Sequence, residues 1–182
     1  MPRQCSYPNV HLPAVKPYYS QSMEKGIQIR LAKQKDAETI REIYNHEVRN
    51  STATFDLVER TTEEQEEWLT ERSGAFSVLV AEMSNKILGF ASLSPYKSRA
   101  AYRTTVEDSI YINEEFRNQG IAGELLFHLL EVAKSSGFHA VIARIGGANE
   151  ASIALHQRFD FEIVGTEKEI GRKFGKWQDV VV

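Results

Sequence analysis

The residues best suited to chemistry lie in one short segment, Arg117-Asn118-Gln119-Gly120-Ile121-Ala122. An alternating apolar stretch, Val106–Ile112, precedes it, and a leucine-rich amphipathic stretch follows it. This order predicts a strand, a short loop and a helix. The first amides of a helix have no partner within the helix, and together with the helix dipole they attract anions. Gly120 leaves room for a phosphate and Arg117 adds a positive charge, so the segment predicts a pyrophosphate-binding loop.

The pattern Arg-x-x-Gly-x-Ala after a strand resembles the acetyl-CoA signature of the GNAT superfamily of N-acetyltransferases. An ordinary glycine turn that opens a helix is the simpler alternative. The loop lacks the Gly-Lys-Ser/Thr of a nucleotide P-loop and the three spaced glycines of a Rossmann turn. The resemblance implies a cofactor site for acetyl-CoA, formed by backbone groups of the strand, by the loop and by one asparagine on a later helix: Ile110, Tyr111, Ile112, Arg117, Asn118, Gln119, Gly120, Ile121, Ala122, Gly123 and Asn149.

The remaining elements are predicted from hydrophobic periodicity and from capping residues. Strands are expected at 27–31, 76–81, 87–93, 106–112, 141–145, about 162–169 and 177–182. Helices are expected after Asp36, from a capping box at Thr62 to about Arg72, after Gly120, and from Asn149 to Phe159. Consecutive strands next to helices indicate an α/β (α+β) fold with a mixed, mostly antiparallel sheet of about seven strands and about four helices. This is also the element order of a GNAT fold.

Composition limits the class of protein. The chain has 182 residues, 42% of them hydrophobic, and a net charge of −3, which suits one globular domain. It has no long basic run and no apolar stretch long enough for a membrane span, so neither nucleic acid nor a membrane is expected as a partner. The one cysteine, Cys5, rules out an internal disulfide and fits a reducing cytoplasm. Residues 1–26 carry four prolines without periodicity and are expected to be a flexible extension, native or added for expression, before a domain at 27–182.

A second signature runs from Asn149 to Phe161 and contains Leu155-His156. It resembles a narrower branch, the phosphinothricin and methionine-sulfoximine acetyltransferases, and the segments 105–112 and 175–180 agree with it. The branch usually has glycine where this chain has Asp160. Because aspartate tolerates a left-handed backbone better than most residues, we expect local strain there without loss of the fold.

Two side chains are predicted to be catalytic. Glu107 lies within the strand before the loop, and it is either a solvated carboxylate or a general base that takes a proton from an ammonium substrate. The resemblance supports the base. His156 is either a packed helix residue or a group that meets the departing CoA sulfur, since many GNAT enzymes place a tyrosine there. Asn149 is also a natural helix N-cap, and the two roles are compatible.

The acceptor side is less defined by sequence. A basic group in the link before the Glu107 strand, and an aromatic residue in the loop between the first two helices, are predicted to bind the substrate: Lys97, Arg99, Arg103 and Phe55. An arginine there suits a carboxylate, although the same residues also fit a solvated loop. The acidic run from Glu63 to Glu71 would favour a polyamine if it faced the pocket, but its spacing is typical of the wet face of a helix.

Together these patterns predict a cytoplasmic acetyl-CoA-dependent N-acetyltransferase, expected to be a homodimer without a metal. Its acceptor would be a small amine, the α-amino group of an amino acid or analogue, acetylated by direct attack in a ternary complex. A GNAT enzyme for another amine, such as a polyamine or a protein N-terminus, is one alternative. A non-catalytic acyl-CoA-binding domain is the other.

Overall fold

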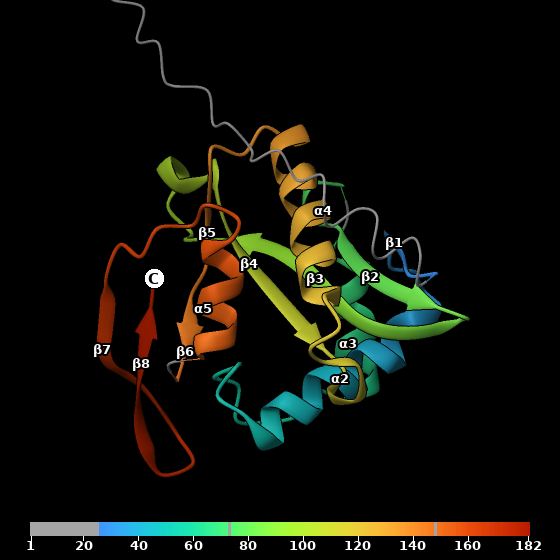
Figure 1. Ribbon diagram of the computed structural model, residues 1–182, viewed down its shortest axis with the longest axis horizontal. Helices are drawn as coiled ribbons and strands as arrows, with labels where there is room; N and C mark the ends of the chain where they lie inside the picture. The colour runs from blue at the N-terminus through green and yellow to red at the C-terminus, as the bar shows by residue number, and fades with distance from the viewer. Residues whose placement is uncertain (1–25, 73, 148) are drawn as a thin grey trace, which may run out of the picture.

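The computed structural model describes residues 26–72, 74–147 and 149–182, so the predicted extension lies almost wholly outside the described residues (Figure 1). The central sheet has five strands in the order β1 (Gln28–Leu31), β2 (Val78–Met83), β3 (Lys86–Pro95), β4 (Thr105–Ile112) and β5 (Ala140–Ile142). All its pairings are antiparallel except that of β4 with β5. A second sheet has the order β6 (Ile145–Gly146), β8 (Lys176–Val181) and β7 (Thr166–Lys173).

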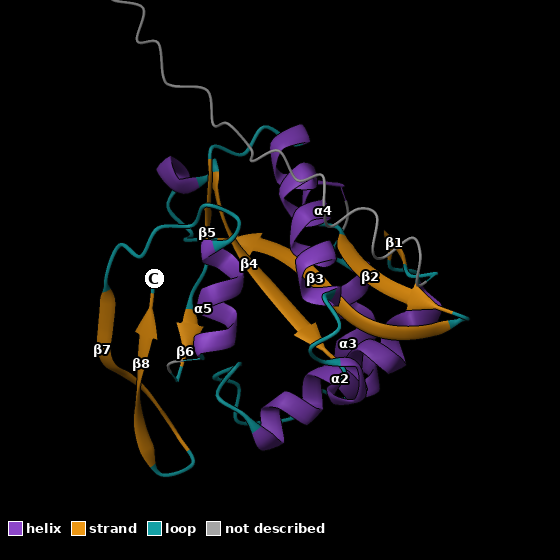
Figure 2. Ribbon diagram, viewed as in Figure 1, coloured by secondary structure: helices purple, strands orange, loops and turns teal. Residues whose placement is uncertain are grey.

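Helices cover both faces of the central sheet. Helix α4 (Ile121–Ser135) packs on one face through a core that includes Leu125, Leu129 and Val106. Helices α2 (Ala37–Asn50) and α3 (Thr62–Thr70) pack on the other face, where Phe90 lies in their core. Helix α5 (Glu150–Gln157) lies beside α4, as Figure 2 shows. Because successive strand residues point to opposite faces, β4 contributes to both cores.

The predicted strand at 141–145 is two strands in the structure. β5 pairs with β4 only from Thr105↔Ala140 to Glu107↔Ile142, and β6 pairs with β8 of the second sheet. The backbone of β4 therefore has no neighbouring strand on the β5 side from Asp108 to Ile112. An apolar run shows only that its residues are buried, so it could not reveal that its two ends belong to different sheets.

Two predicted helix starts need correction in detail. Helix α3 begins at Thr62, but its capping box is formed by Thr61 and Glu64, one residue earlier than predicted, with N–O distances of 3.2 Å (Glu64 N to Thr61 Oγ1) and 2.9 Å (Thr61 N to Glu64 Oε2). Asp36 is the N-cap of α2 as predicted, but its carboxylate accepts hydrogen bonds from the Lys33 amide and the Arg30 guanidinium instead of helix amides.

The remaining boundaries shift by a few residues, as in β2, which begins at Val78 instead of residue 76, and β7, which begins at Thr166 instead of residue 162. Asp160, after the end of α5, has a φ of 61°, so the left-handed conformation expected for that position is present. The acidic side chains of α3 are exposed, and its buried residues are Gln65 and Leu69. The acidic run is thus the wet face of the helix.

Candidate active site

The predicted phosphate loop joins β4 to α4. Gly120 is the N-cap of α4 with a φ of 85°, and Asn118 also has a positive φ of 61°. The backbone amides of residues 118–122 donate to no other described residue, whereas those of Gly123 and Glu124 donate to the Gly120 carbonyl. A Cβ atom on Gly120 would meet nothing within 4 Å. Protein packing therefore does not require this glycine, and the open amides fit the pyrophosphate of acetyl-CoA.

Arg117 is already held by a carboxylate. Its Nη2 forms an ion pair with Glu47 of α2, whose side chain is only 6% exposed and also accepts a hydrogen bond from Ser51. The Arg117 side chain is 45% exposed, and a guanidinium has five N–H donors, so donors remain for a phosphate. The sequence analysis placed Arg117 in the loop but did not predict this partner, which lies 70 residues away.

The free edge of β4 lies next to this loop. Ile110, Tyr111 and Ile112, predicted to contact the cofactor through their backbones, all lie in the stretch that has no strand on the β5 side. Asn149 caps α5, because its Oδ1 accepts a hydrogen bond from the Ser152 amide at 3.1 Å. Its amide NH₂ remains as a donor. The strand edge and the loop thus provide unpaired backbone groups, and Asn149 adds a side-chain donor, which together suit the amides of a pantetheine arm.

Glu107 lies where β4 and β5 separate, since the Glu107↔Ile142 pair is the last between them. It shares a face with Tyr111, which packs against Tyr44 of α2 with ring centroids 5.2 Å apart. Its carboxylate forms no hydrogen bond or ion pair with any residue that the structure describes. Burial raises the pKa of Glu107, the nearby charge of Arg144 opposes this, and Asp108 and Glu167 add to the rise. A half-buried, unpaired carboxylate with a raised pKa has the properties of a general base.

Asp108 points to the opposite face and meets His156. The distance from His156 Nε2 to Asp108 Oδ2 is 3.0 Å, and both side chains are buried, 8% and 2% exposed. His156 Nδ1 lies 2.7 Å from the Ser152 carbonyl oxygen, which can only accept, so Nδ1 carries a hydrogen. Burial alone would lower the pKa of His156, but the hydrogen bond to Asp108, its charge and the Ser152 carbonyl raise the pKa above the usual value.

Sequence reasoning missed Asp108, although a signal was present. Asp108 alternates with Val106 and Ile110 on the apolar face of the strand, and a carboxylate at such a position needs a buried partner. The pair joins α5 to β4, because its residues are 48 positions apart. The other oxygen, Asp108 Oδ1, is buried and has no donor within the part of the chain that the structure describes.

Phe55 packs against the second sheet. A Cβ atom on Gly146 of β6 or on Gly171 of β7 would lie 2.6 Å or 2.3 Å from the Phe55 ring, so only glycine permits this close approach. Lys173, at the end of β7, is buried and donates to the Thr54 carbonyl at 2.7 Å, which ties the hairpin to the Phe55 loop. Phe55 remains 36% exposed, and its predicted contact with the substrate stays a prediction.

The predicted basic residues lie in the link between β3 and β4. Figure 1 shows this link at the opposite end of β4 from the phosphate loop. Lys97 Nζ lies 4.6 Å from the centroid of the Tyr96 ring. Arg99 and Arg103 are exposed, and neither forms an ion pair with a described residue. The structure thus brings Glu107 together with the free edge of β4. It places these cations near the start of the same strand, without an ion-pair partner among the described residues.

The described helices include none that is long and apolar enough to cross a membrane. Nor do the described histidine, aspartate and glutamate residues gather in threes as a metal site would require. A free strand edge beside an open helix start, with a carboxylate where the strands separate, is the arrangement that the predicted acyltransferase, using a CoA thioester, requires.

The chain belongs to the GNAT acetyltransferase family, because residues 29–182 match the family described as "Acetyltransferase (GNAT) domain". It is 38% identical over 158 residues to a phosphinothricin N-acetyltransferase of Streptomyces coelicolor, which covers 85% of this chain and 92% of that protein. It is 36% identical over 154 residues to an L-methionine sulfoximine/L-methionine sulfone acetyltransferase of Pseudomonas paraeruginosa, with coverages of 84% and 90%.

Among solved structures, it resembles a phosphinothricin acetyltransferase from Sinorhizobium meliloti in complex with acetyl-CoA. The TM-score is 0.82 at 36% identity, and the match covers 86% of this chain and 85% of that one. The predicted GNAT fold and its resemblance to the phosphinothricin branch are therefore confirmed. The protein is an N-acetyltransferase whose acetyl donor is acetyl-CoA.

Proposed function

We propose that this enzyme acetylates the α-amino group of a small amino acid or amino-acid analogue, of the phosphinothricin or methionine-sulfoximine type. The single observation that carries the proposal is Glu107, an unpaired carboxylate with a raised pKa where β4 and β5 separate. The relatives that share most of the chain are named for amino-acid analogues, which supports the acceptor class.

Glu107 acts as the general base. An amino acid arrives as an ammonium ion, which has no lone pair, so one proton must leave before nitrogen can attack. Glu107 accepts this proton directly or through water, and the raised pKa brings the carboxylate closer to the amine in proton affinity. Acetyl-CoA supplies the activated acetyl group. The amine attacks it directly, because no cysteine lies in the domain for an acyl-enzyme, and a free β4 amide stabilises negative charge on the carbonyl oxygen.

His156 supplies the proton to the sulfur that leaves. The hydrogen bond to Asp108 and its charge raise the pKa of His156, which favours the protonated ring that this role needs. Both ring nitrogens already have acceptors, so the residue also holds α5 against β4. Positioning and proton donation therefore depend on the same Asp108–His156 pair.

Arg99 or Arg103 binds the α-carboxylate of the acceptor. Both are exposed without an acidic partner among the described residues, and both lie in the link that leads into the Glu107 strand. The polyamine alternative depended on the acidic run of α3, whose side chains point to solvent. The Glu107 site argues against a non-catalytic acyl-CoA-binding domain.

The enzyme functions as a cytoplasmic homodimer. Support for a dimer comes from large exposed apolar side chains on and before the second sheet: Ile163, Val164, Ile170, Phe174 and Trp177. A cavity of about 630 Å³ between α4, α5 and the segment 161–164 is lined mostly by apolar residues on the same side. Light scattering after gel filtration tests this, and a monomer at micromolar concentration would contradict it.

The decisive assay follows free thiol released from acetyl-CoA with a panel of acceptors. Amino acids, phosphinothricin, methionine sulfone, spermidine and peptides with free N-termini are compared at equal concentration. We expect turnover with amino acids or their analogues, and none with N-acetylated versions. Turnover confined to polyamines or peptides would contradict the proposed acceptor class, and no turnover with any amine would favour a non-catalytic domain.

A further inference from the structure

Two arginines flank one tryptophan on the face of the central sheet that α2 and α3 cover. The guanidinium carbon of Arg72 lies 4.0 Å from the centroid of the Trp68 ring, and that of Arg60 lies 4.9 Å from it. Arg60 also lies 3.7 Å from the centroid of Tyr44. Cation–π contacts of this kind stabilise a guanidinium, but they supply no negative charge.

This arginine pair lies on the same face of the central sheet as Glu107. Arg72 Nη2 donates to Ser94 Oγ at 3.2 Å, and Ser94 is paired with Glu107 across β3 and β4. Directly paired residues of neighbouring strands share a face. Trp68 packs on Phe90, with centroids 6.3 Å apart, and Phe90 is paired with Tyr111 on that same face. A row of strand residues thus leads from Glu107 to the arginine pair.

The positive charges of the pair have no ion-pair partner among the described residues. Neither Arg60 nor Arg72 forms an ion pair within the described ranges, whereas five other arginines do: Arg30, Arg41, Arg49, Arg117 and Arg144. Two N–H donors in the cluster, Arg72 Nε and Gln65 Nε2, are buried with no acceptor among the described residues. Burial lowers the pKa of Arg72, and the charge of Arg60 lowers it further.

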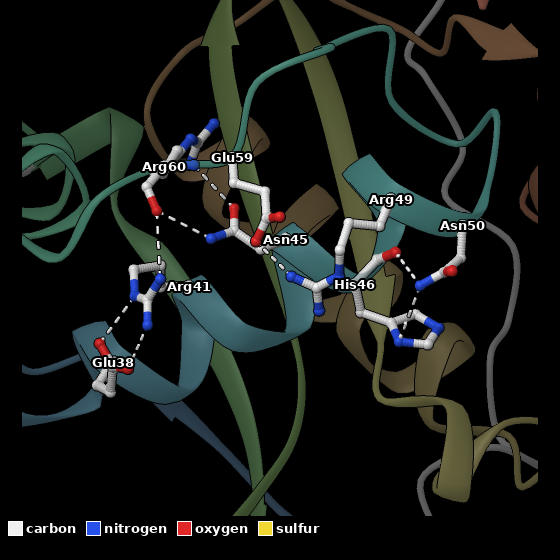
Figure 3. Close-up of polar contacts among 8 residues, drawn as sticks. All are labelled: Glu38, Arg41, Asn45, His46, Arg49, Asn50, Glu59 and Arg60. Atoms are coloured by element: carbon white, nitrogen blue, oxygen red, sulfur yellow. Dashed lines mark hydrogen bonds and ion pairs between the residues drawn. The ribbon is translucent and has the colours of Figure 1, made fainter. Parts of the chain in front are cut away.

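The backbone of Arg60 is fixed from both sides, as Figure 3 shows. The Arg60 amide donates to Asn45 Oδ1 at 2.9 Å, and Asn45 Nδ2 donates to the Arg60 carbonyl at 2.8 Å. Arg41, itself paired with Glu38, donates to the same carbonyl at 3.3 Å. Asn45 is 1% exposed. Asn45 is therefore a buried side chain that fixes the backbone of the loop, and so fixes the position of the Arg60 side chain. The Arg60 guanidinium points away from Asn45.

We propose that Arg60 and Arg72 form an anion subsite for the side chain of the acceptor. This inference rests on the proposed function, and it narrows the substrate to amino acids whose side chain ends in a two-oxygen anion, such as a carboxylate or a phosphinate. Guanidinium groups bind such anions through paired N–H donors. The anion at the end of the acceptor side chain supplies the negative charge that pairs with the two guanidinium groups.

The position fits the side chain of the acceptor better than its α-carboxylate. The α-carboxylate is one carbon away from the amine, which must reach Glu107. Arg72 instead reaches Ser94, which lies across the strand pair from Glu107. The two sites are therefore neighbours along the sheet, joined through Ser94, as required for groups several bonds apart in one acceptor.

Phosphinothricin and L-methionine sulfone provide a matched pair of acceptors. They have the same carbon chain and α-carboxylate, but the first ends in a charged methylphosphinate and the second in a neutral methylsulfone. Arg72→Met should lower kcat/KM for phosphinothricin by about 10- to 150-fold, the loss of a charge-assisted hydrogen bond, and change that for the sulfone only a few-fold. Arg60→Met should act in the same direction, and Arg72→Lys, which keeps the charge, should retain part of the preference.

Arg172→Met is the matched control. Arg172 also lies over a tryptophan, 5.8 Å from the Trp177 centroid, but this stack is exposed on the β7–β8 hairpin. It should leave the ratio of the two acceptors unchanged. Thermal melting of each variant, with acetyl-CoA present, shows whether the fold and cofactor site survive.

Calorimetric binding of both acceptors in the presence of CoA separates this inference from the proposed function. Selective loss of phosphinothricin binding in Arg72→Met supports the subsite even if the wild type proves unable to turn over either acceptor. Equal losses for both acceptors, or none for either, would overturn it while leaving turnover by the wild type intact. The inference also fails if the wild type binds neither acceptor.

Discussion

The two faces of β4 carry carboxylates that are adjacent in sequence but differ in whether they have a partner. On the α4–α5 face, Asp108 is buried and ion-paired with His156. On the α2–α3 face, Glu107 has no hydrogen-bond partner among the described residues, and Arg60 and Arg72 of that face form no ion pair with a described residue. Of these two consecutive residues, Asp108 is thus buried in an ion pair, whereas Glu107 carries a charge without a partner among the described residues.

This difference separates charges that hold the protein together from charges that await a ligand. A buried ion pair gains little stability over apolar packing, but removing one partner costs much because the other is left uncompensated. An unpaired charge in a half-buried site lowers the stability of the free protein. When a substrate of opposite charge binds and pairs with it, that loss is recovered. The Asp108–His156 pair is therefore expected to affect stability as well as proton donation to the sulfur, whereas Glu107 is expected to affect turnover alone.

The largest effect is expected from Glu107→Gln. Turnover near pH 7 should fall by roughly 10²-fold or more, within the range for loss of a general base, because the ammonium acceptor no longer loses its proton. The KM for acetyl-CoA should change little. Glu115→Gln, an exposed residue paired with Lys86, serves as control in the same thiol-release assay. Wild-type rates from Glu107→Gln would remove this residue from the mechanism.

On the closed face, His156→Asn should lower the free energy of unfolding by about 3 kcal/mol or more, since it leaves Asp108 buried and unpaired. The pKa of His156 is raised in the folded protein, so binding of its proton stabilises the fold. This contribution is fully present when the pH is below the ordinary histidine pKa near 6.5. It is lost as pH rises through the raised value. Urea unfolding from pH 5 to 9 should show the deficit of the variant shrinking with pH, and a deficit that grows with pH would contradict the ion pair.

Gly120→Glu should remove most of the thermal stabilisation by acetyl-CoA, worth about 2.7 kcal/mol at a hundred times Kd. The new side chain puts bulk and negative charge beside the amides of the loop. Gly137→Glu is a matched control: Gly137 follows the other end of α4, has a φ of 78°, and a Cβ there also meets nothing within 4 Å. An equal loss of stabilisation in both variants would mean that backbone strain, and not the phosphate site, is responsible.

A smaller effect is expected from Arg99→Ala and Arg103→Ala. Loss of a charge-assisted hydrogen bond to the α-carboxylate costs roughly 1.5–3 kcal/mol, or about 10- to 150-fold in kcat/KM for the acceptor. The KM for acetyl-CoA should be spared. Esterifying the acceptor should impose a similar penalty on the wild type and little more on the responsible variant. Equal rates for acid and ester in the wild type would rule out this clamp.

The parts of the site that sequence could predict are local in the chain. Gly120 and its flanking strand and helix are contiguous, so their pattern was readable, and alternation along β4 correctly placed Glu107 beside Tyr111. The capping box shifted by one residue because Thr61 and Thr62 both match its pattern. Because the two threonines are adjacent and each is followed three residues later by Glu or Gln, the sequence pattern cannot decide which one is the N-cap.

The parts that sequence missed depend on contacts between distant residues. His156 meets Asp108 across 48 positions, and Arg117 meets Glu47 across 70. Arg60 and Arg72 look like ordinary surface arginines in the sequence, because what distinguishes them is the lack of an ion-pair partner in the part of the chain that the structure describes. Such an absence is a property of the folded chain and has no sequence motif.

The pH dependence of kcat/KM for the acceptor, measured for the wild type and Glu107→Gln, tests the central claim most directly. The wild-type rate should fall on the acid side as pH drops through the raised pKa of Glu107, in addition to the titration of the amine. Glu107→Gln should lose that step and recover part of its rate at high pH, where the amine is deprotonated without help. Identical profiles for the two proteins would contradict the account.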